Sequence, residues 1–393
     1  MLNQTMLALG KTRSCIRELF SYGLAQAAIV GKENVFDYSL GNPSIPAPPE
    51  VNKAIVDIVE HTDSLAVHSY TPAQGLPEAR KAVAEDLNRR YGTAIRPDNL
   101  FFTCGAAPAL IAVIRALGVE GAEIIGIAPF FPEYRPFAES NGVRFVAVPA
   151  ETGSFQIDFE KLEAAIGVHT QAVIVNSPNN PSGVIYTRET LEKLAALLTR
   201  KSAEIGHPIF IIADEPYREL AYDGAEVVFI PTVYRNTIVC YSYSKSLSLP
   251  GERIGYVCVS DEVEDSADVY AAIAGAARAS GHVCAPSLQQ RVIALCASSR
   301  PNVDAYDSNR ELLYENLSAY GYECVKPKGA FYMFVKAPGG DSQRFSDRAK
   351  ERNLLLVPGD GFGCPAYFRI STCVSPDMIR RSLPIFKALI DEE

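Results

Sequence analysis

The chain has 393 residues, of which 48% are hydrophobic and 21% charged, and its formal net charge is −9. This composition is typical of a globular protein, and the length favours two domains. The negative charge and the lack of a basic tract argue against a nucleic-acid partner, and no apolar run reaches membrane-spanning length. The N-terminus does not resemble a signal peptide, which favours the cytoplasm. Nine cysteines without a C-x-x-C pair indicate reduced thiols, and the scattered histidines indicate no metal site.

The chain begins with a helical pattern, in which Ile16, Leu19, Phe20 and Leu24 recur at helical spacing. Residues 38–49 are rich in proline and predict an extended arm. A helix is expected at 51–59, then a loop at 68–75 and a helix that ends near residue 91. We assign residues 1–49 to an N-terminal arm that joins a smaller domain.

From residue 100 onward, short apolar runs alternate with helical patterns such as that of residues 192–201. The apolar runs cover residues 100–102, 123–127, 143–148, 172–175, 209–212, 237–240 and 256–259. Alternation of this kind predicts an α/β fold, with a mainly parallel seven-stranded sheet between helices. We place this large domain at residues 50–300.

The rest of the chain predicts a smaller α+β domain, residues 301–393, built from both chain termini. Helices are expected at 267–279 and 286–320, with a break near Pro301. Strands are expected at 322–325, 330–335, 354–357 and 367–370. Ser375 and Pro376 form a good start for the last helix, as N-cap and first helical residue.

Unusual residues directly follow the expected strands. Gly105, Phe131, Asn180, Asp214 and Lys245 each lie just beyond a different strand. Since ligands bind outside the carboxyl ends of strands in open parallel sheets, these loops predict one shared site.

The chemistry of these residues indicates a pyridoxal-phosphate site. Lys245 lies among small hydroxyls, after Ser242 and Ser244 and before Arg253, which suits a Schiff-base lysine beside an anion site. A buried carboxylate at Asp214 needs a cation, and a protonated pyridine nitrogen is a natural partner.

Two further groups fit the same cofactor. Tyr217 and Asn180 can form hydrogen bonds with a ring hydroxyl. Gly105, Ala106 and Ala107 lead from a strand into a helix, where free backbone amides can bind a phosphate. Arg253 and Ser242 can complete that phosphate site.

In sequence, these motifs resemble the class I and II aminotransferases of the fold-type I pyridoxal-phosphate enzymes, in particular the aspartate aminotransferases. The resemblance covers most of the chain. It rests on Ser-x-Ser-Lys245 with Gly-x-Arg253-Ile-Gly, on Asp214-Glu-Pro-Tyr217, and on the Asn-Pro turn at Asn180, where Ser182 replaces the usual threonine.

The resemblance also implies roles for residues outside these motifs. Phe131 stacks on the cofactor ring, and Tyr70 reaches the phosphate of the neighbouring subunit. Gly41 lines the substrate side, and Arg369 clamps the substrate α-carboxylate, as Asn180 also helps to do. A homodimer with shared active sites is therefore expected.

The implied activity is ping-pong transfer of an amino group from an L-amino acid to a 2-oxo acid through a Lys245 aldimine. The catalytic residues are then Lys245, Asp214 and Tyr217. Aspartate or glutamate is the leading expectation for the donor, with Arg278 of the partner as second cation, although Arg278 also fits a solvated helix end. Aromatic or other neutral donors stay open, as do a carbon–sulfur lyase and a decarboxylase.

Overall fold

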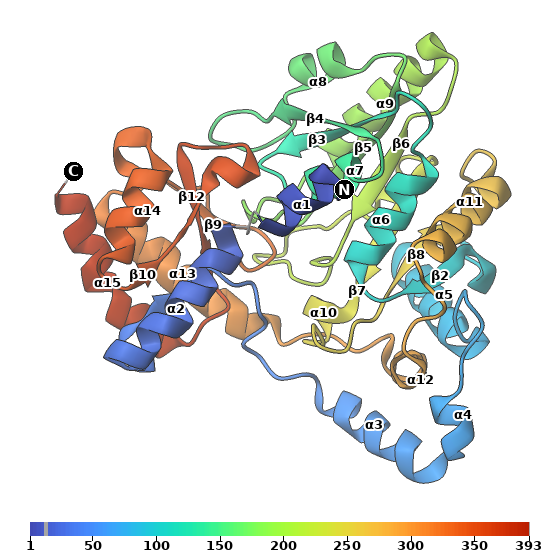
Figure 1. Ribbon diagram of the computed structural model, residues 1–393, viewed down its shortest axis with the longest axis horizontal. Helices are drawn as coiled ribbons and strands as arrows, with labels where there is room; N and C mark the ends of the chain where they lie inside the picture. Colours follow the sequence, from blue (N-terminus) through green and yellow to red (C-terminus); the bar gives the residue numbers. More distant parts are fainter. Residues whose placement is uncertain (12–14, 393) are drawn as a thin grey trace.

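A seven-stranded sheet forms the centre of the computed structural model, which describes residues 1–11 and 15–392 (Figure 1). Its strand order is β2-β8-β7-β6-β5-β3-β4. The strands are β2 (Leu100–Thr103), β3 (Glu123–Ala128), β4 (Arg144–Pro149), β5 (Thr170–Asn176), β6 (Phe210–Asp214), β7 (Thr237–Ser242) and β8 (Gly255–Val259). Each apolar run expected as a strand of this sheet is one, so the prediction of a mainly parallel α/β sheet is confirmed.

One strand of the sheet runs against the others. β8 pairs antiparallel with both β7 and β2, whereas β4, β3, β5, β6 and β7 pair in parallel. Because β2 and β7 are both antiparallel to β8, they run in the same direction as each other. The carboxyl ends of β2 and β7 therefore lie at the same edge as those of β5 and β6.

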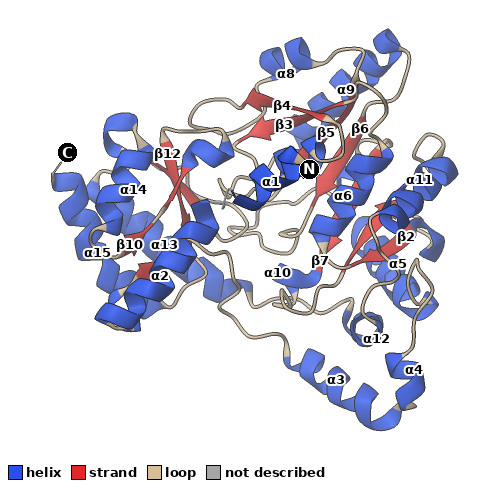
Figure 2. Cartoon of the chain, viewed as in Figure 1, coloured by secondary structure: helices blue, strands red, loops and turns tan. Residues whose placement is uncertain are grey.

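Helices cover both faces of the large sheet (Figure 2). One face packs against α6 (Ala106–Ala116), α7 (Tyr134–Glu139) and α11 (Ser266–Ala279). The other packs against α5 (Pro77–Tyr91), α8 (Phe159–Ala165) and α9 (Arg188–Ile205). α12 (Ser287–Cys296) packs on α5, and α3 (Pro49–His61) and α4 (Ser64–His68) pack on α12, farther from the sheet (Figure 1). This double cover explains why β3, β6, β7 and β8 are buried along their whole length and mostly apolar, rather than alternating.

A second group of elements lies beside the large sheet, at the left of Figure 1. It holds the antiparallel sheet β11-β12-β9 and the parallel pair β1-β10. Its strands are β1 (Phe36–Asp37), β9 (Tyr332–Lys336), β10 (Leu354–Leu355), β11 (Val357–Pro358) and β12 (Tyr367–Ser371). Its helices are α2 (Cys15–Val30), α13 (Val303–Tyr320), α14 (Ser342–Lys350) and α15 (Pro376–Asp391). Phe36 pairs with Leu354, so residues from both ends of the chain build it.

Two expected strands differ in this region. Residues 322–325 form only an isolated bridge between Cys324 and Val335, and Pro327, which has no backbone N–H, follows closely. The apolar run 354–357 divides into β10 and β11, which belong to different sheets. The expected start of the last helix is confirmed, because the Ser375 side chain accepts a hydrogen bond from the Met378 N–H.

Two short α-helices and five short 3₁₀ helices complete the described part of the chain. α1 (Gln4–Lys11) crosses in front of the junction between the two groups of elements, and α10 (Tyr243–Ser246) follows β7 (Figure 1). Within residues 1–11 and 15–392, no helix combines the length and apolarity needed to cross a membrane.

Candidate active site

Strand register brings the predicted site residues together at one sheet edge. Gly255, at the start of β8, pairs with Thr103 on one side and Ser242 on the other. Asn176 pairs with Asp214 in the same way at the ends of β5 and β6. The loops that follow these strands therefore begin next to one another, at the same edge of the sheet.

These loops surround a cavity of about 300 Å³. Most of the residues predicted for the site line it: Gly41, Ala106, Ala107, Phe131, Asn180, Asp214, Tyr217, Ser242, Ser244, Lys245, Arg253 and Arg369. The cavity is also lined by residues that the sequence did not single out: Ile16, Leu110, Asn176, Pro216, Pro250 and Tyr332.

Lys245 lies on α10, a single helical turn whose N-cap is Ser242. Its Nζ atom donates a 2.5 Å hydrogen bond to the Gly41 carbonyl, which comes from the N-terminal arm. Burial lowers the pKa of Lys245 to about 8, and the nearby cations Arg369 and Arg253 act in the same direction. A lysine with this pKa has a much larger fraction of neutral, nucleophilic amine near neutral pH than an ordinary lysine.

Asp214 is buried at the end of β6, and its two carboxylate oxygens have different surroundings. Oδ2 accepts a 2.5 Å hydrogen bond from the Tyr134 hydroxyl. Oδ1 is buried without a hydrogen-bond partner among the described residues. Burial raises the pKa of Asp214 to about 7, against the effect of the Tyr134 hydrogen bond. A buried acceptor without a partner is costly, so Oδ1 is suited to a donor that enters the cavity.

Arg253 and the start of α6 form a small anion site. Gly105 is the N-cap of α6 and has a φ of +94°, and a Cβ atom there would lie 2.7 Å from Arg253 Nη2. Ser242 and Ser244 hydroxyls lie 2.8 Å apart, and Arg253 Nη1 donates to Ser244 Oγ at 3.5 Å. Free amides of a helix start beside a guanidinium and two hydroxyls suit a phosphate group.

Arg369, in the middle of β12, is only 2% exposed. Its Nη1 donates to Asn180 Oδ1 at 2.9 Å, and its Nη2 donates to the Ser39 carbonyl at 2.5 Å. The guanidinium lies between the rings of Tyr332 and Phe362, at 4.5 and 5.2 Å from their centroids. No carboxylate pairs with it within residues 1–11 and 15–392. A buried cation without an anion is suited to a carboxylate ligand.

Tyr217 and Phe131 both line the cavity, and they come from different loops, those after β6 and β3. Tyr217 is 5% exposed, and its hydroxyl lies 3.2 Å from that of Tyr332. Phe131 is half-buried and packs edge-on against Tyr134 at 5.6 Å.

Three predicted residues do not line the cavity: Tyr70, Arg278 and Gly105, the last of which directly precedes two residues that do. Tyr70 is 86% exposed, and Arg278, in the last turn of α11, is also exposed. Gln290 lies next to the loop that holds Tyr70, since its Nε2 donates to Thr71 Oγ1 at 2.9 Å. A single chain does not bring Tyr70 or Arg278 to the site.

Tyr134 and Tyr332 are two buried tyrosines of the site that sequence reasoning missed. Tyr134 stands three residues after Phe131, but its partner Asp214 is 80 positions away. Tyr332 follows Phe331 in an apolar strand, where nothing marks it as different from its neighbours. Neither contact leaves a signal in a single sequence.

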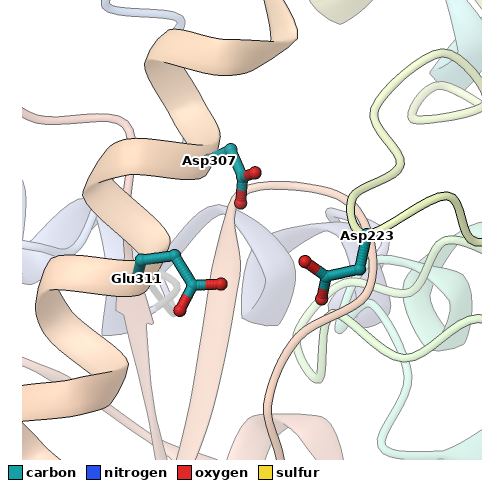
Figure 3. Close-up of side chains that lie close together, drawn as sticks. All are labelled: Asp223, Asp307 and Glu311. Carbon is teal, nitrogen blue, oxygen red and sulfur yellow. The ribbon is translucent and has the colours of Figure 1, made fainter.

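One further cluster of carboxylates, Asp223, Asp307 and Glu311, lies between α13 and a loop (Figure 3). Arg310 pairs with Asp223 at 2.9 Å and with Asp307 at 2.6 Å. Lys328 also reaches Asp223, and Lys326 reaches Glu311. These cations compensate the negative charge, so the cluster is an ion-pair network rather than a site that requires a metal.

The described site fits pyridoxal phosphate on four independent features. Lys245 offers an amine of lowered pKa, Asp214 Oδ1 lacks a donor such as a pyridinium N–H, and the start of α6 with Arg253 suits the phosphate. Phe131 offers a flat apolar face. Fold and site together define a pyridoxal-phosphate enzyme built on a mainly parallel sheet.

Comparison with known proteins narrows this class to one family. The family described as aminotransferase class I and II matches residues 33–384. The chain belongs to this family, and it is a pyridoxal-phosphate-dependent aminotransferase.

Relatives and solved structures agree with the family assignment. The aspartate/prephenate aminotransferase of Thermus thermophilus is 30% identical over 359 residues, which are 89% of each chain. A crystal structure of an aminotransferase from Eubacterium rectale is 57% identical, with a TM-score of 0.98 over 100% of this chain and 99% of that one. The Thermus thermophilus aspartate aminotransferase with maleate is 27% identical, with a TM-score of 0.87 over 99% of both chains.

Proposed function

We propose that this aminotransferase exchanges the amino group of an acidic L-amino acid, aspartate or glutamate, with that of a 2-oxo acid in two half-reactions. The observation that carries the proposal is Arg369, a buried cation that shares one cavity with Lys245. A substrate carboxylate supplies the anion that Arg369 lacks among the described residues, and it brings the substrate α-carbon into the cavity that Lys245 lines.

Pyridoxal phosphate, when bound, supplies an electron sink for the bonds of the substrate α-carbon. Lys245 would bind the cofactor, and its Nζ amine would take the proton from the substrate α-carbon as general base. Asp214 Oδ1, which lacks a partner among the described residues, would accept a hydrogen bond from the protonated ring nitrogen. Tyr217 and Asn180 would donate hydrogen bonds to the ring oxygen, and Phe131 would pack on the ring.

The remaining assignments follow the same pattern. The Gly105–Ala107 segment, together with Ser242, Ser244 and Arg253, binds the phosphate. Gly41 lines the substrate side, where its carbonyl accepts the hydrogen bond from Lys245.

A second substrate carboxylate needs a cation from outside this cavity. Lys245, Arg253 and Arg369 are the cations that line it among the described residues, and each already has a role. We assign the task to Arg278 from a second copy of the chain, and the contact with the phosphate to Tyr70 from that copy. Exposed apolar side chains support such a homodimer: Val56, Val59, Leu65, Val283 and Leu295.

The relatives support an acidic donor. Those from Thermus thermophilus and Thermotoga maritima are named for aspartate, and the Thermus structure contains maleate, a dicarboxylate. Neutral or aromatic donors form a second candidate, favoured by the apolar wall of Ile16, Leu110 and Phe131.

An amino-donor panel with 2-oxoglutarate as acceptor separates these candidates. We expect kcat/KM for aspartate to exceed that for alanine, leucine and phenylalanine, and Arg278→Ala to reduce this preference about tenfold or more. Arg235→Ala is the matched control, because Arg235 is also an exposed arginine and pairs with Glu264 away from the cavity. If the aspartate-to-alanine preference is unchanged in Arg278→Ala, the role of Arg278 is wrong.

The division into an arm (1–49), a large domain (50–300) and a small domain (301–393) remains part of the proposal, supported by the pairing of β1 with β10. We also propose a cytoplasmic location. The nine cysteines, all of them free thiols, support a reducing compartment.

A further inference from the structure

Tyr332 lies where three separate segments of the site meet. It is the first residue of β9, is 3% exposed, and lines the cavity. β9 pairs with β12, the strand that carries Arg369, and Tyr332 stands opposite Ser371 in this register. Tyr332 has no role in the sequence analysis or in the proposed function above.

The ring of Tyr332 supports the guanidinium of Arg369. The Arg369 Cζ atom lies 4.5 Å above the ring centroid, and both side chains are buried. A desolvated cation over an aromatic ring is held by the negative charge of the ring face, which fixes the plane of the guanidinium. Asn180 and Ser39 accept hydrogen bonds from Arg369 Nη1 and Nη2 at the edge of the guanidinium. The Tyr332 ring contacts its face, at a shorter distance than the Phe362 ring, which lies 5.2 Å away.

The hydroxyl of Tyr332 reaches across to the loop after β6. It lies 3.2 Å from the Tyr217 hydroxyl, and the two rings meet edge to face at 5.8 Å. It also fills the space beside Gly41, where a Cβ atom would lie only 1.7 Å from the Tyr332 Oη. With Tyr332 in this position, only glycine fits at position 41.

A phenol has one proton to donate, and a pair of phenols shares two. If the Tyr332 hydroxyl donates to the Tyr217 oxygen, the Tyr217 proton is free to point into the cavity, and its own hydrogen bond is strengthened by the one that it accepts. The opposite arrangement would use the Tyr217 proton on Tyr332 and leave none for a ligand.

We propose that Tyr332 is a positioning residue that joins the substrate clamp Arg369 to Tyr217: its ring holds the guanidinium, and its hydroxyl donates to Tyr217 and so directs the Tyr217 proton toward the cofactor. This role rests on the proposed function, which places the substrate carboxylate at Arg369 and the cofactor ring oxygen at Tyr217. It adds a residue that links these two contacts directly.

Two substitutions separate the ring from the hydroxyl. Tyr332→Phe keeps the ring over Arg369 and removes the hydrogen bond to Tyr217, whereas Tyr332→Leu removes both. Tyr322→Phe is the matched control, because Tyr322 is a buried tyrosine of the same part of the fold whose hydroxyl donates to the Phe386 carbonyl. Thermal unfolding of all three proteins without cofactor measures the cost of the substitution to the fold.

The holoenzymes are then compared by three measurements. These are the pH titration of the visible absorbance of the Lys245-bound cofactor, the dissociation constant of pyridoxal phosphate, and kcat and KM for aspartate. Tyr332→Phe is expected to shift the titration midpoint and to lower kcat about three- to tenfold, with KM within about twofold of wild type. Tyr332→Leu is expected to raise KM about five- to thirtyfold in addition.

Each part of the proposal has its own contrary result. A titration and kcat of Tyr332→Phe that match those of Tyr322→Phe overturn the link to Tyr217. A KM of Tyr332→Leu that equals that of Tyr332→Phe overturns the support of Arg369. Absence of turnover by the wild type with every donor contradicts the proposed function instead, and the titration, which needs no turnover, still decides on the link between Tyr332 and Tyr217.

Discussion

The Tyr134 hydroxyl donates a 2.5 Å hydrogen bond to Asp214 Oδ2, and the other oxygen, Oδ1, is buried without a partner among the described residues. The two residues come from α7 and β6, and both are almost fully buried. Tyr134 fixes the orientation of the carboxylate and stabilises its charge, while Oδ1 stays available to the cofactor.

Tyr134→Phe should weaken the binding of pyridoxal phosphate. Loss of the hydrogen bond raises the pKa of Asp214 further. A smaller fraction of the protein then has a charged carboxylate that can pair with the protonated ring nitrogen. A hydrogen bond to a charged group contributes about 1.5–3 kcal/mol, which corresponds to an increase of roughly 10- to 100-fold in the dissociation constant. Equilibrium dialysis of the cofactor measures it.

Tyr234→Phe is the control for Tyr134→Phe, since the Tyr234 hydroxyl is also buried and donates to the Ile209 carbonyl. Equal cofactor affinity in the two variants would show that Tyr134 does not act through Asp214.

The stability of the apoenzyme should depend on Asp214 in a defined pH window. The folded pKa of Asp214 is about 7, above the ordinary value of 3.8, so between these values the folded state binds a proton that the unfolded state releases. Stability therefore falls as pH rises through this window, by up to about 1.4 kcal/mol per pH unit. Asp214→Asn, which has no charge to bury, should lack this dependence.

Urea unfolding of the two apoenzymes from pH 4 to pH 8 measures the difference. We expect Asp214→Asn to be the more stable protein at pH 8 and the gap to close toward pH 4. If the difference in free energy of unfolding between the two proteins is constant across this range, the pKa of Asp214 is not raised by burial in the folded state.

Gly105→Ala should impair the phosphate site. The new Cβ atom would lie 2.7 Å from Arg253 Nη2, so the guanidinium has to move. Gly92→Ala is the matched control, because Gly92 also has a positive φ, of +66°, but its Cβ would meet nothing within 4 Å. Both substitutions strain the backbone by about 1 kcal/mol or more, and thermal unfolding should show this.

Only Gly105→Ala is expected to lose cofactor affinity, by about tenfold or more, as measured by fluorescence titration with pyridoxal phosphate. If Gly92→Ala loses as much affinity, the effect comes from general destabilisation and not from the phosphate site.

Arg369→Lys should raise KM for the amino donor while the affinity for the cofactor stays near that of the wild type. Lysine keeps the charge but loses the planar fork that Asn180 and Ser39 hold in place. Steady-state kinetics should show an increase in KM of about 10- to 100-fold. An unchanged KM would place the substrate carboxylate elsewhere.

The strands and the loops that follow them could be predicted from the sequence, because a sheet covered on both faces produces continuous apolar runs such as that of β3. The direction of the strands could not be predicted, since β8 is as apolar as the parallel strands of the sheet and differs from them only in its antiparallel pairing. The strand expected at residues 322–325 is also reduced to one bridge at Cys324, because Pro327 has no backbone N–H to continue the pairing.

The site could be predicted where a chemical function needs a particular side chain in a local motif, as at Lys245 and Asp214. Residues that act through a distant partner escaped prediction. Tyr332 meets Tyr217 across 115 positions of the sequence, and such a contact becomes visible only when the fold brings the strands together.

The central claim, that Lys245 carries out transamination in this cavity, is tested most directly by a single half-reaction. Holoenzyme is mixed with excess L-aspartate without an acceptor, and the 2-oxo acid and ammonia that form are measured over time. We predict one equivalent of oxaloacetate per active site, no release of ammonia, and resumed turnover when 2-oxoglutarate is added; Lys245→Ala should form no oxaloacetate. Continuous release of ammonia without an acceptor, or near-normal transamination by Lys245→Ala, would contradict the account.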